Sequence, residues 1–445
     1  MNQATFPDKE SHHQRSTARA GHWYRTLWRW HFYAGLFCIP FVVILSVTGG
    51  IYLFKPQLDH WAERDFRNLA TAGKALPIEK QIEHALVAYP DAMLVNIRVT
   101  ANTQDAHRLL IRQGGETIHL YVHPATGEVL QANNPDRRLT AWVKNLHGEL
   151  LIGTAGSILV ELAACWAFVL LMTGVYLWWP RGQKGLGGVL YPRLRKGGRT
   201  FWRDLHAVIG FWLVGLTFFL LITALPWSQV WGSAFKELRQ LASGPTEHSW
   251  RISSHSHGDR TSYDTPLPTT KVWQQARALE FAPPVELSWD HQRHHWKVAS
   301  QHQNRPLRQT AWLDSDTGEL IESNGFSEKG ALDKAIGIGI AAHEGHLFGW
   351  LNQLLGLLTA LGLITVCVSG AVMWWRRRPE KRLGAPKPVE AHTGKVIGGL
   401  VLLLGVLLPV VGLSLIALWM MERWVVRRFK SVAVWLGVYR DIQES

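Results

Sequence analysis

Residues 147–179 read HGELLIGTAGSILVELAACWAFVLLMTGVYLWW. A histidine opens this stretch, a long and mostly apolar run follows, and the pair Trp178–Trp179 closes it. About 20 helical residues cross the ~30 Å hydrocarbon core of a bilayer, and Trp side chains favour its two interfaces. The stretch therefore predicts a membrane-spanning helix with a histidine at one end. A continuous helix from His147 to Trp178 would be about 46 Å long, which predicts that His147 lies at or above the outer interface unless the helix bends at Gly153 or Gly156.

The same pattern returns in the second half of the chain. After His147, glycines follow at 6 and 27 residues and a Trp pair begins at 31, and the same residue types follow His343 at the same three distances. His31 and His206 also correspond, since each precedes a glycine by 4 residues and a threonine by 17. Matched distances of this kind indicate an internal repeat. We therefore predict two copies of a unit made of a span, an outer segment and a second span, followed by a fifth span.

Composition narrows the class of protein. The 445 residues are 47% hydrophobic and 18% charged, and the mean hydropathy is close to zero. These values exclude a simple cytosolic enzyme, a disordered chain and a disulfide scaffold. The 23 tryptophans favour a protein with membrane interfaces. The three cysteines, Cys38, Cys165 and Cys367, all lie in apolar runs, so we expect no disulfide.

The predicted fold is a membrane α-helical bundle of about five spans, with a two-fold internal repeat and two α+β modules outside the cytoplasm. Each module is predicted from a helical stretch, near 78–88 or 269–280, and from two strands joined by a turn that contains Thr-Gly-Glu, at 122–128 or 313–319. The predicted layout is an N-terminal segment at 1–30, spans at 31–54, 146–179, 204–227, 343–375 and 395–420, modules at 55–145 and 228–342, basic loops at 180–203 and 376–394, and a C-terminal segment at 421–445.

Basic residues set the predicted orientation. The N-terminal segment and both basic loops are rich in Lys and Arg and fall on one side of the membrane. By the positive-inside rule that side is the cytoplasm. These flanking residues account for the net charge of +13, so we expect no nucleic-acid partner. One cluster disagrees, because five crossings place Arg423, Arg427 and Arg428 outside, and the topology of the last 25 residues stays open.

Four histidines form two pairs at two depths. His31 and His206 begin spans that run outward, so both lie near the cytoplasmic face. His147 and His343 begin spans that run inward, so both lie near the outer face. Histidine in a membrane segment is costly and commonly functional, and imidazoles from two helices can bind haem iron axially. The sequence therefore predicts two bis-histidine haems, with the glycine one turn beyond each cytoplasmic-side histidine leaving room for a porphyrin.

Two other histidines are alternative ligands. His346 lies three residues from His343 on the same helical side and could replace it. His392 begins the fifth span on the cytoplasmic side and could replace His31 or His206. The run His343-Glu-Gly-His346 has two residues between its histidines, whereas the zinc protease motif has three, so we exclude that motif.

Three basic residues near the histidines could interact with a haem. Arg29, Arg203 and Lys144 lie near the histidines and either pair haem propionates or anchor the chain at the interface. No Cys-x-x-Cys-His occurs, so any haem is expected to be non-covalent, and no dinucleotide fingerprint or P-loop occurs. Segment 290–295 holds one aspartate and three histidines that could bind a metal, although a solvated polar strand and loop is the favoured interpretation.

The motifs together resemble the PepSY-associated transmembrane proteins of bacteria. The resemblance covers roughly residues 25–378, and the Thr-Gly-Glu hairpins are similar to PepSY modules. Similar members include inner-membrane ferric-siderophore reductases that carry two b haems in four helices. The resemblance implies two haem b groups, held by His31 with His206 and by His147 with His343, and electron delivery to iron chelates in the periplasm. Its motifs are Leu146-His-Gly-Glu-Leu-Leu-Ile-Gly153, Thr173-Gly-Val-Tyr-Leu-Trp-Trp-Pro-Arg181, Arg203-Asp-Leu-His-Ala-Val-Ile-Gly210 and His343-Glu-Gly-His-Leu-Phe-Gly349.

One function is preferred and two are alternatives. The preferred function is an oxidoreductase of the bacterial inner membrane that takes electrons from a quinol or a separate reductase and reduces a periplasmic ferric siderophore, which releases iron. In the first alternative the modules bind or inhibit a periplasmic protein and the helices only anchor them in the lipid. In the second, the protein transports haem or an iron chelate as cargo. The spectrum of the purified protein after dithionite reduction distinguishes the three.

Overall fold

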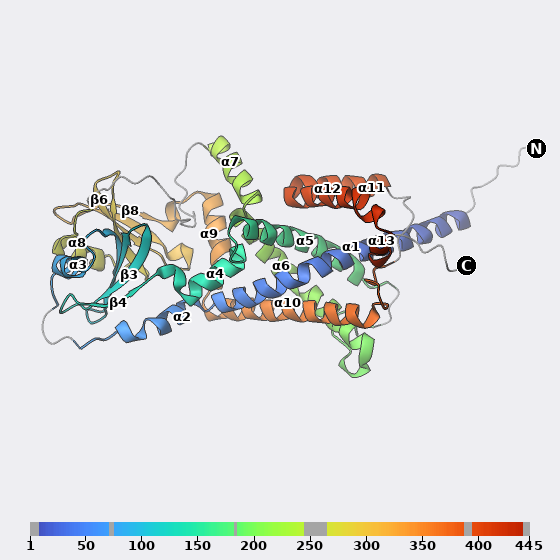
Figure 1. Cartoon of the computed structure of the whole chain (residues 1–445), viewed down its shortest axis with the longest axis horizontal. Helices are drawn as coiled ribbons and strands as arrows, with labels where there is room; N and C mark the ends of the chain where they lie inside the picture. The colour runs from blue at the N-terminus through green and yellow to red at the C-terminus, as the bar shows by residue number, and fades with distance from the viewer. Residues whose placement is uncertain (1–8, 71–74, 182–184, 244–264, 387–393, 439–445) are drawn as a thin grey trace, which may run out of the picture. The chain divides into compact units, whose positions relative to one another are not determined.

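Two compact units make up the protein. The computed structural model describes residues 9–70, 75–181, 185–243, 265–386 and 394–438 (Figure 1). The chain enters the second unit twice, each time between two long apolar helices. The helical unit comprises Met1–Thr48, Leu146–Pro245 and Leu358–Ser445, and the sheet unit comprises Gly49–Asn145 and Thr246–Leu357.

Among the described residues, five helices are long and apolar enough to cross a membrane. They carry exposed apolar side chains such as Phe218, Leu358 and Leu361, which suits contact with lipid. The predicted membrane protein is thereby confirmed. The five segments are Trp23–Tyr52 within α1 (Lys9–Tyr52), Thr154–Trp178 (α5), Gly198–Trp227, which begins with α6 (Gly198–Ala224), Trp350–Arg377 (α10) and Pro409–Arg428, which begins with α12 (Pro409–Trp424).

Helices α5 and α6 pack through aromatic side chains. The ring of Trp178 stacks on Phe211 with centroids 3.8 Å apart, and Phe168 meets Phe218 edge-on. The one acidic residue of the α5 span, Glu161, is 2% exposed. Its carboxylate accepts hydrogen bonds from the first backbone N–H groups at the start of α7 (Trp231–Ser243), at 2.7 and 2.9 Å. This cap compensates the cost of a carboxylate inside an apolar span.

Two of the predicted spans are interrupted near their N-terminal ends. α4 (Leu139–Glu149) ends two residues after His147, and α5 begins only after Gly153, whose φ is +64°. α9 (Ala331–His343) ends at His343, and α10 begins after Gly349, whose φ is +69°. The helix from His147 to Trp178 is therefore not continuous, and the break includes Gly153, one of the two glycines at which the sequence allowed a bend. Positive φ values end both first helices, at Leu150 and Leu151 after α4 and at Gly345 after α9, because such a conformation cannot continue an α-helix.

The predicted fifth span at 395–420 is also wrong as a single helix. It forms two helices, α11 (Gly394–Leu407) and α12, which meet at Pro409. Proline lacks the N–H that a continuous helix requires and ends the preceding one. A Cβ added to Gly412 would lie 2.8 Å from Cα of Gly405, so the two helices fold back on each other as a tight hairpin. Its turn packs Leu408 and Val411 against Cys165 of α5.

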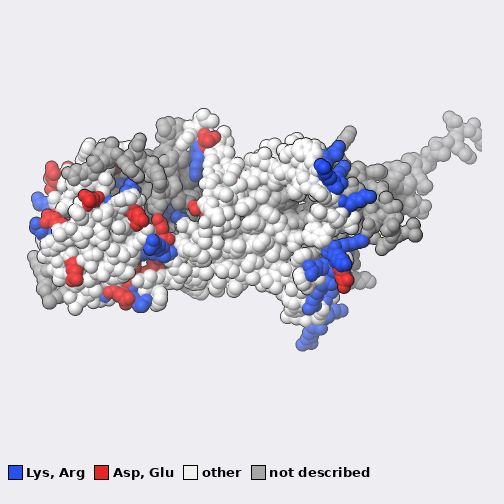
Figure 2. Space-filling model, viewed as in Figure 1, with Lys and Arg blue, Asp and Glu red and all other residues white. Residues whose placement is uncertain are grey.

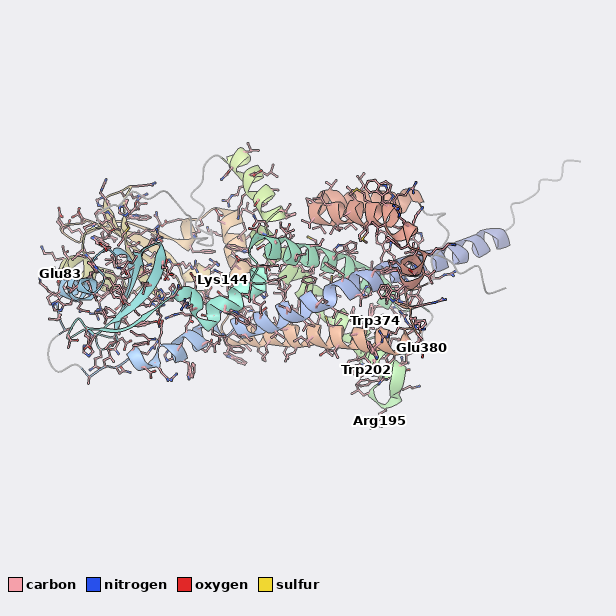
Figure 3. All side chains as sticks on the ribbon, viewed as in Figure 1. Glu83, Lys144, Arg195, Trp202, Trp374 and Glu380 are labelled. Atoms are coloured by element: carbon pink, nitrogen blue, oxygen red, sulfur yellow. The ribbon has the colours of Figure 1, made fainter. Side chains whose placement is uncertain are left out.

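The segment after α12 lies at the same end of the helical unit as the start of the α1 span. In this segment α13 (Lys430–Trp435) precedes Gly437, whose carbonyl accepts a hydrogen bond from Arg29 of α1 at 3.0 Å. Backbone N–H of Leu383, in the loop after α10, donates to Trp435 O at 3.0 Å. Lys and Arg side chains gather at this end (Figure 2), where Figure 3 also shows Arg195.

One eight-stranded antiparallel sheet dominates the sheet unit. The strand order is β4-β3-β2-β1-β5-β6-β7-β8, so the predicted modules join through β1 and β5, with Ile97 opposite Leu287. Both predicted Thr-Gly-Glu segments form the hairpins β3–β4 and β7–β8, whose glycines have φ of +73°. The strands are β1 (Met93–Val99), β2 (His107–Gln113), β3 (Glu116–Val122), β4 (Val129–Asn133), β5 (Val285–Asp290), β6 (His295–Ser300), β7 (Gln309–Leu313) and β8 (Leu320–Gly325).

The core of the sheet unit lies between the sheet and two helices. α3 (Ile78–Val87) contributes Ile82 and α8 (Thr270–Ala278) contributes Val272, both fully buried. They belong to one apolar cluster with Ile97, Leu109 and Leu287 of the strands. The helices match the stretches predicted near 78–88 and 269–280, so the α+β prediction is confirmed. α2 (Lys55–Ala62) precedes α3 in this unit.

Candidate functional site

The structure brings together two of the predicted ligands inside the helical unit. His31 lies in α1 and His206 in α6, and their ring centroids are 6.3 Å apart with the ring planes at 89°. The sequence separates these histidines by 175 residues, yet both belong to the same unit. Their pairing was predicted only from the direction of the spans and from the repeat.

Each of the two rings is held through its Nδ1 atom. Nδ1 of His31 lies 2.9 Å from Oγ1 of Thr173 in α5. Nδ1 of His206 lies 2.9 Å from the carbonyl oxygen of Val366 in α10, with Oγ of Ser369 at 3.4 Å. Because Nδ1 is engaged in both rings, Nε2 is the nitrogen left for another partner.

Glycines let the two rings lie against the neighbouring helices. A Cβ added to Gly174 would be 3.3 Å from Cε1 of His31, and one added to Gly370 would be 3.3 Å from Cε1 of His206. A Cβ at Gly210, one turn after His206, would meet no heavy atom within 4 Å. The backbone is therefore tight where it touches the imidazoles and open at Gly210, whereas a Cβ at Gly35, the corresponding glycine after His31, would lie 3.8 Å from Cδ2 of Leu170.

The separation of the two rings is compatible with both imidazoles holding one metal ion. Two imidazoles that bind opposite faces of one metal ion, each through a nitrogen about 2 Å away, have centroids about 6 Å apart, since each nitrogen lies about 1 Å from its ring centre. The separation of 6.3 Å between His31 and His206 meets this requirement. Neutral imidazoles from two helices of a bundle are an established ligand set for haem.

The two other predicted ligands belong to different units. His147 lies in the last turn of α4, in the helical unit, and its Nδ1 is 2.9 Å from Oγ1 of Thr48 in α1. His343 is the last residue of α9, in the sheet unit. The pairing of His147 with His343 stays a prediction from the sequence.

The sequence of the chain matches the model of one protein family. The model of the PepSY-associated TM region matches residues 28–377. The chain belongs to the PepSY-associated transmembrane family. The family match contains all four predicted ligands and ends at the last residue of α10, before the hairpin of α11 and α12. No curated protein matches the sequence.

Of the alternative ligands, one can be described. His346 follows α9 in the turn that belongs to the family match, and its buried Nε2 has no hydrogen-bond partner within the described residues. Burial, followed by the nearby His302 and Lys55, lowers the pKa of His346 to about 4. Because its imidazole is neutral and its buried Nε2 has no partner in the described residues, His346 remains an alternative to His343. The other alternative, His392, lies outside the described residues.

Two of the three predicted propionate partners, Arg29 and Arg203, have protein partners. Arg29 donates to the carbonyl oxygens of Pro386 and Gly437. Arg203 pairs with Asp204 at 2.8 Å, and that carboxylate is fully buried. These contacts favour the alternative role of both arginines, as anchors at one end of the helical unit. Figure 3 shows Lys144 on α4, and its role is untested.

The aspartate of segment 290–295 forms a turn. Asp290 accepts hydrogen bonds from the backbone N–H of Gln292 and Arg293 and from the indole of Trp312. In the described part of the chain, no group of three or more His, Cys, Asp or Glu is arranged to hold a metal ion. These contacts agree with the favoured interpretation of a polar strand and loop.

The hydroxyl residues at the site were missed by the sequence interpretation. Thr173 and Ser369 each precede one of the glycines whose spacing revealed the repeat, and 196 residues separate the two pairs. The sequence therefore contained a signal, namely a hydroxyl residue followed by glycine at the same place in both halves. It was not recognised because hydroxyl side chains are common inside apolar helices, where they bond to their own backbone.

Proposed function

We propose that the protein is a di-haem b electron-transfer protein of the bacterial inner membrane, with its N-terminus in the cytoplasm. It takes electrons from a quinol or a separate reductase on the cytoplasmic side. It gives them to an acceptor in the periplasm, for which a ferric siderophore is the preferred candidate. The observation that supports this most is the perpendicular pair His31 and His206, 6.3 Å apart within the helical unit.

His31 and His206 would hold the inner haem through Nε2, and α1, α5, α6 and α10 would surround it. When bound, a bis-histidine haem supplies one-electron chemistry, since its iron alternates between the ferric and ferrous states. The protein fixes the orientation of the ligands through their Nδ1 contacts. Apolar helices exclude water from the iron, which tunes its potential.

The second haem is proposed from the repeat. We infer that the two halves of the chain are copies, so that His147 and His343 hold an outer haem as His31 and His206 hold the inner one. Paired contacts support this view. Each inner histidine is held by the helix that bears the hydroxyl–glycine pair of its own half, Thr173–Gly174 for one and Ser369–Gly370 for the other.

The proposed acceptor follows from the position of the outer ligands. Each of them ends a helix that leads out of the β-rich segments, rather than lying deep within a span. An electron that reaches this level can pass to a soluble iron chelate. One electron converts Fe³⁺ of a ferric siderophore to Fe²⁺, which such chelators hold less firmly, and the iron is released.

The haem content of the purified protein tests the proposal. We expect two non-covalent haems per chain and a b-type spectrum after dithionite reduction. His31→Ala and His206→Ala should each remove about one haem per chain. His60→Ala, at an exposed histidine of α2, is the matched control and should keep both.

Other results would contradict the proposal. A colourless protein from cells well supplied with haem would favour an anchored binding protein. Haem that washes out readily would favour transport of haem as cargo. If the dithionite-reduced protein holds two haems but is not reoxidised by an added ferric siderophore, the acceptor is wrong while the electron-transfer function stands.

A further inference from the structure

Three hydroxyl side chains contact the described ligands in the same way. Thr173 contacts Nδ1 of His31, Ser369 lies near Nδ1 of His206, and Thr48 contacts Nδ1 of His147. Each of the three hydroxyls also donates to the carbonyl oxygen four residues earlier in its own helix, at 2.7 Å. All three residues are at most 5% exposed.

The hydrogen bond that each hydroxyl donates to its own backbone determines the direction of its hydrogen bond with the imidazole. A hydroxyl has one hydrogen to donate and two lone pairs to accept with. Because that hydrogen goes to the backbone carbonyl, the hydroxyl oxygen accepts from the imidazole. Nδ1 of His31 and of His147 therefore carries the proton. The carbonyl of Val366, which can only accept, imposes the same protonation on His206.

We propose that Thr173, Thr48 and the carbonyl of Val366 are positioning groups that fix the histidine tautomer. In this tautomer Nδ1 donates and Nε2 has the free lone pair, so Nε2 is the iron-binding nitrogen of all three histidines. This inference rests on the proposed haem function and adds the groups that prepare the ligands for it. Outer groups of this kind orient a metal ligand and raise its basicity.

The two inner ligands differ in what holds them. His31 has the hydroxyl of Thr173 at 2.9 Å as its close partner, and the backbone carbonyl of Leu170 is a second one. His206 has the carbonyl at 2.9 Å, and Ser369 lies farther away at 3.4 Å. Removing the hydroxyl should therefore affect the haem strongly at position 173 and weakly at position 369. A merely structural role for these buried hydroxyls predicts no such asymmetry in the properties of the haem.

Loss of the hydroxyl contact should change both the affinity of the protein for haem and the midpoint potential of that haem. Loss of an outer hydrogen bond to a metal ligand typically costs about 10- to 100-fold in metal affinity. When the hydroxyl is removed and the carbonyl of Leu170 is the acceptor that remains for His31, the Nδ1 proton is held more tightly and the imidazole is a weaker base. A weaker axial base stabilises the ferric state less, so the midpoint potential of the inner haem should rise.

Three variants of the full-length protein test this inference. Thr173→Val keeps the shape and removes the hydroxyl, Thr173→Ser restores it, and Ser369→Ala removes the weaker contact. Thr217→Val is the control, because Thr217 is a buried threonine of α6 whose hydroxyl has no hydrogen-bond partner in the described structure. The readouts are haem content, midpoint potential by optical redox titration and the electron paramagnetic resonance spectrum of the ferric haem.

We expect Thr173→Val to raise the potential of one haem or to lose that haem. Thr173→Ser, Ser369→Ala and Thr217→Val should stay close to the wild type. Unchanged haem content, potential and resonance spectrum in Thr173→Val would overturn the inference, as would equal effects of Thr173→Val and Thr217→Val. Failure of the proposed function looks different, because the wild-type protein would then hold no haem.

Discussion

At the scale of single residues, Thr48 offers a second test of the hydroxyl contacts. It holds His147, whereas Thr173 holds His31, so the two threonines serve different proposed haems. Thr48→Val should change the potential or the retention of the outer haem and leave the inner one unchanged. The Thr48→Val, Thr173→Val double variant should show both changes in a redox titration. A single haem signal altered by both substitutions would show that these histidines share one site.

Glu63 makes the stability of the sheet unit dependent on acid. Burial by itself raises the pKa of this carboxyl, but Arg98, Arg108 and Arg138 lower it to about 2. The carboxylate is 7% exposed and accepts from Arg98 at 2.8 Å and from Arg138 at 2.9 Å. A carboxyl whose pKa is depressed on folding stabilises the fold above its unfolded pKa, about 4.3. That contribution is lost as the pH falls through 2.

Thermal unfolding in detergent at several pH values measures this effect. Glu63→Gln should lower the melting temperature at pH 7, because it leaves three arginines around a neutral group. It should also remove part of the loss that the wild type shows below about pH 4.3. The control is Glu83→Gln, because Glu83 lies on α3 and pairs with Lys80 at an exposed position (Figure 3). Equal effects of the two substitutions would argue against the buried cluster.

At the scale of elements, the break between α4 and α5 depends on Gly153. Its φ of +64° and ψ of −140° lie in a region that other residues rarely adopt, although a Cβ there would meet no atom within 4 Å. Gly153→Ala should therefore destabilise through backbone strain alone, by about 1–3 kcal/mol. Gly148→Ala, inside α4, should be neutral or slightly stabilising. Melting temperatures that change equally in both variants would contradict this reasoning.

These elements also mark the limit of what the sequence could predict. Hydropathy located four of the five long apolar helices, because length and apolar content decide whether a segment suits lipid. It could not locate the break at Gly153 or the fold at Pro409, because both lie within apolar runs. Hydropathy does not record backbone conformation. Pro409 was a local signal for that break, since proline ends or kinks a helix, but proline is also tolerated within membrane helices.

At the candidate site, the sequence predicted which histidines pair but not which groups hold them. His31 and His206 were predicted as a pair because the repeat and the span directions place them at one depth, and the structure brings them together. Their Nδ1 partners were not predicted, since the register between α1 and α5 or between α6 and α10 depends on packing. A linear pattern gives depth along a span, but it does not give the rotation of one helix against another.

At the scale of the whole molecule, the hairpin of α11 and α12 removes a conflict in the predicted topology. Five crossings would separate the basic residues after α12 from those of the other loops. From the hairpin of 14 and 16 residues, whose turn packs against Cys165 near the middle of α5, we infer that the chain returns to the side of the membrane from which it came. The contact of Arg29 with Gly437 agrees with this, because it joins the start of the α1 span to the C-terminal segment.

The inferred topology of four crossings and a re-entrant hairpin gives a prediction that labelling can test, because Pro409–Arg428 is also long and apolar enough to cross a membrane. Single cysteines at Arg195, Arg428 and Glu83 would be reacted in intact cells with a maleimide that does not cross the membrane. The native cysteines are buried, so they should give little background. Arg195→Cys and Arg428→Cys should both be protected until the cells are opened, and Glu83→Cys should react at once. Labelling of Arg428→Cys in intact cells, with Arg195→Cys protected, would mean that the last helix crosses the membrane. The basic residues after α12 would then violate the positive-inside rule.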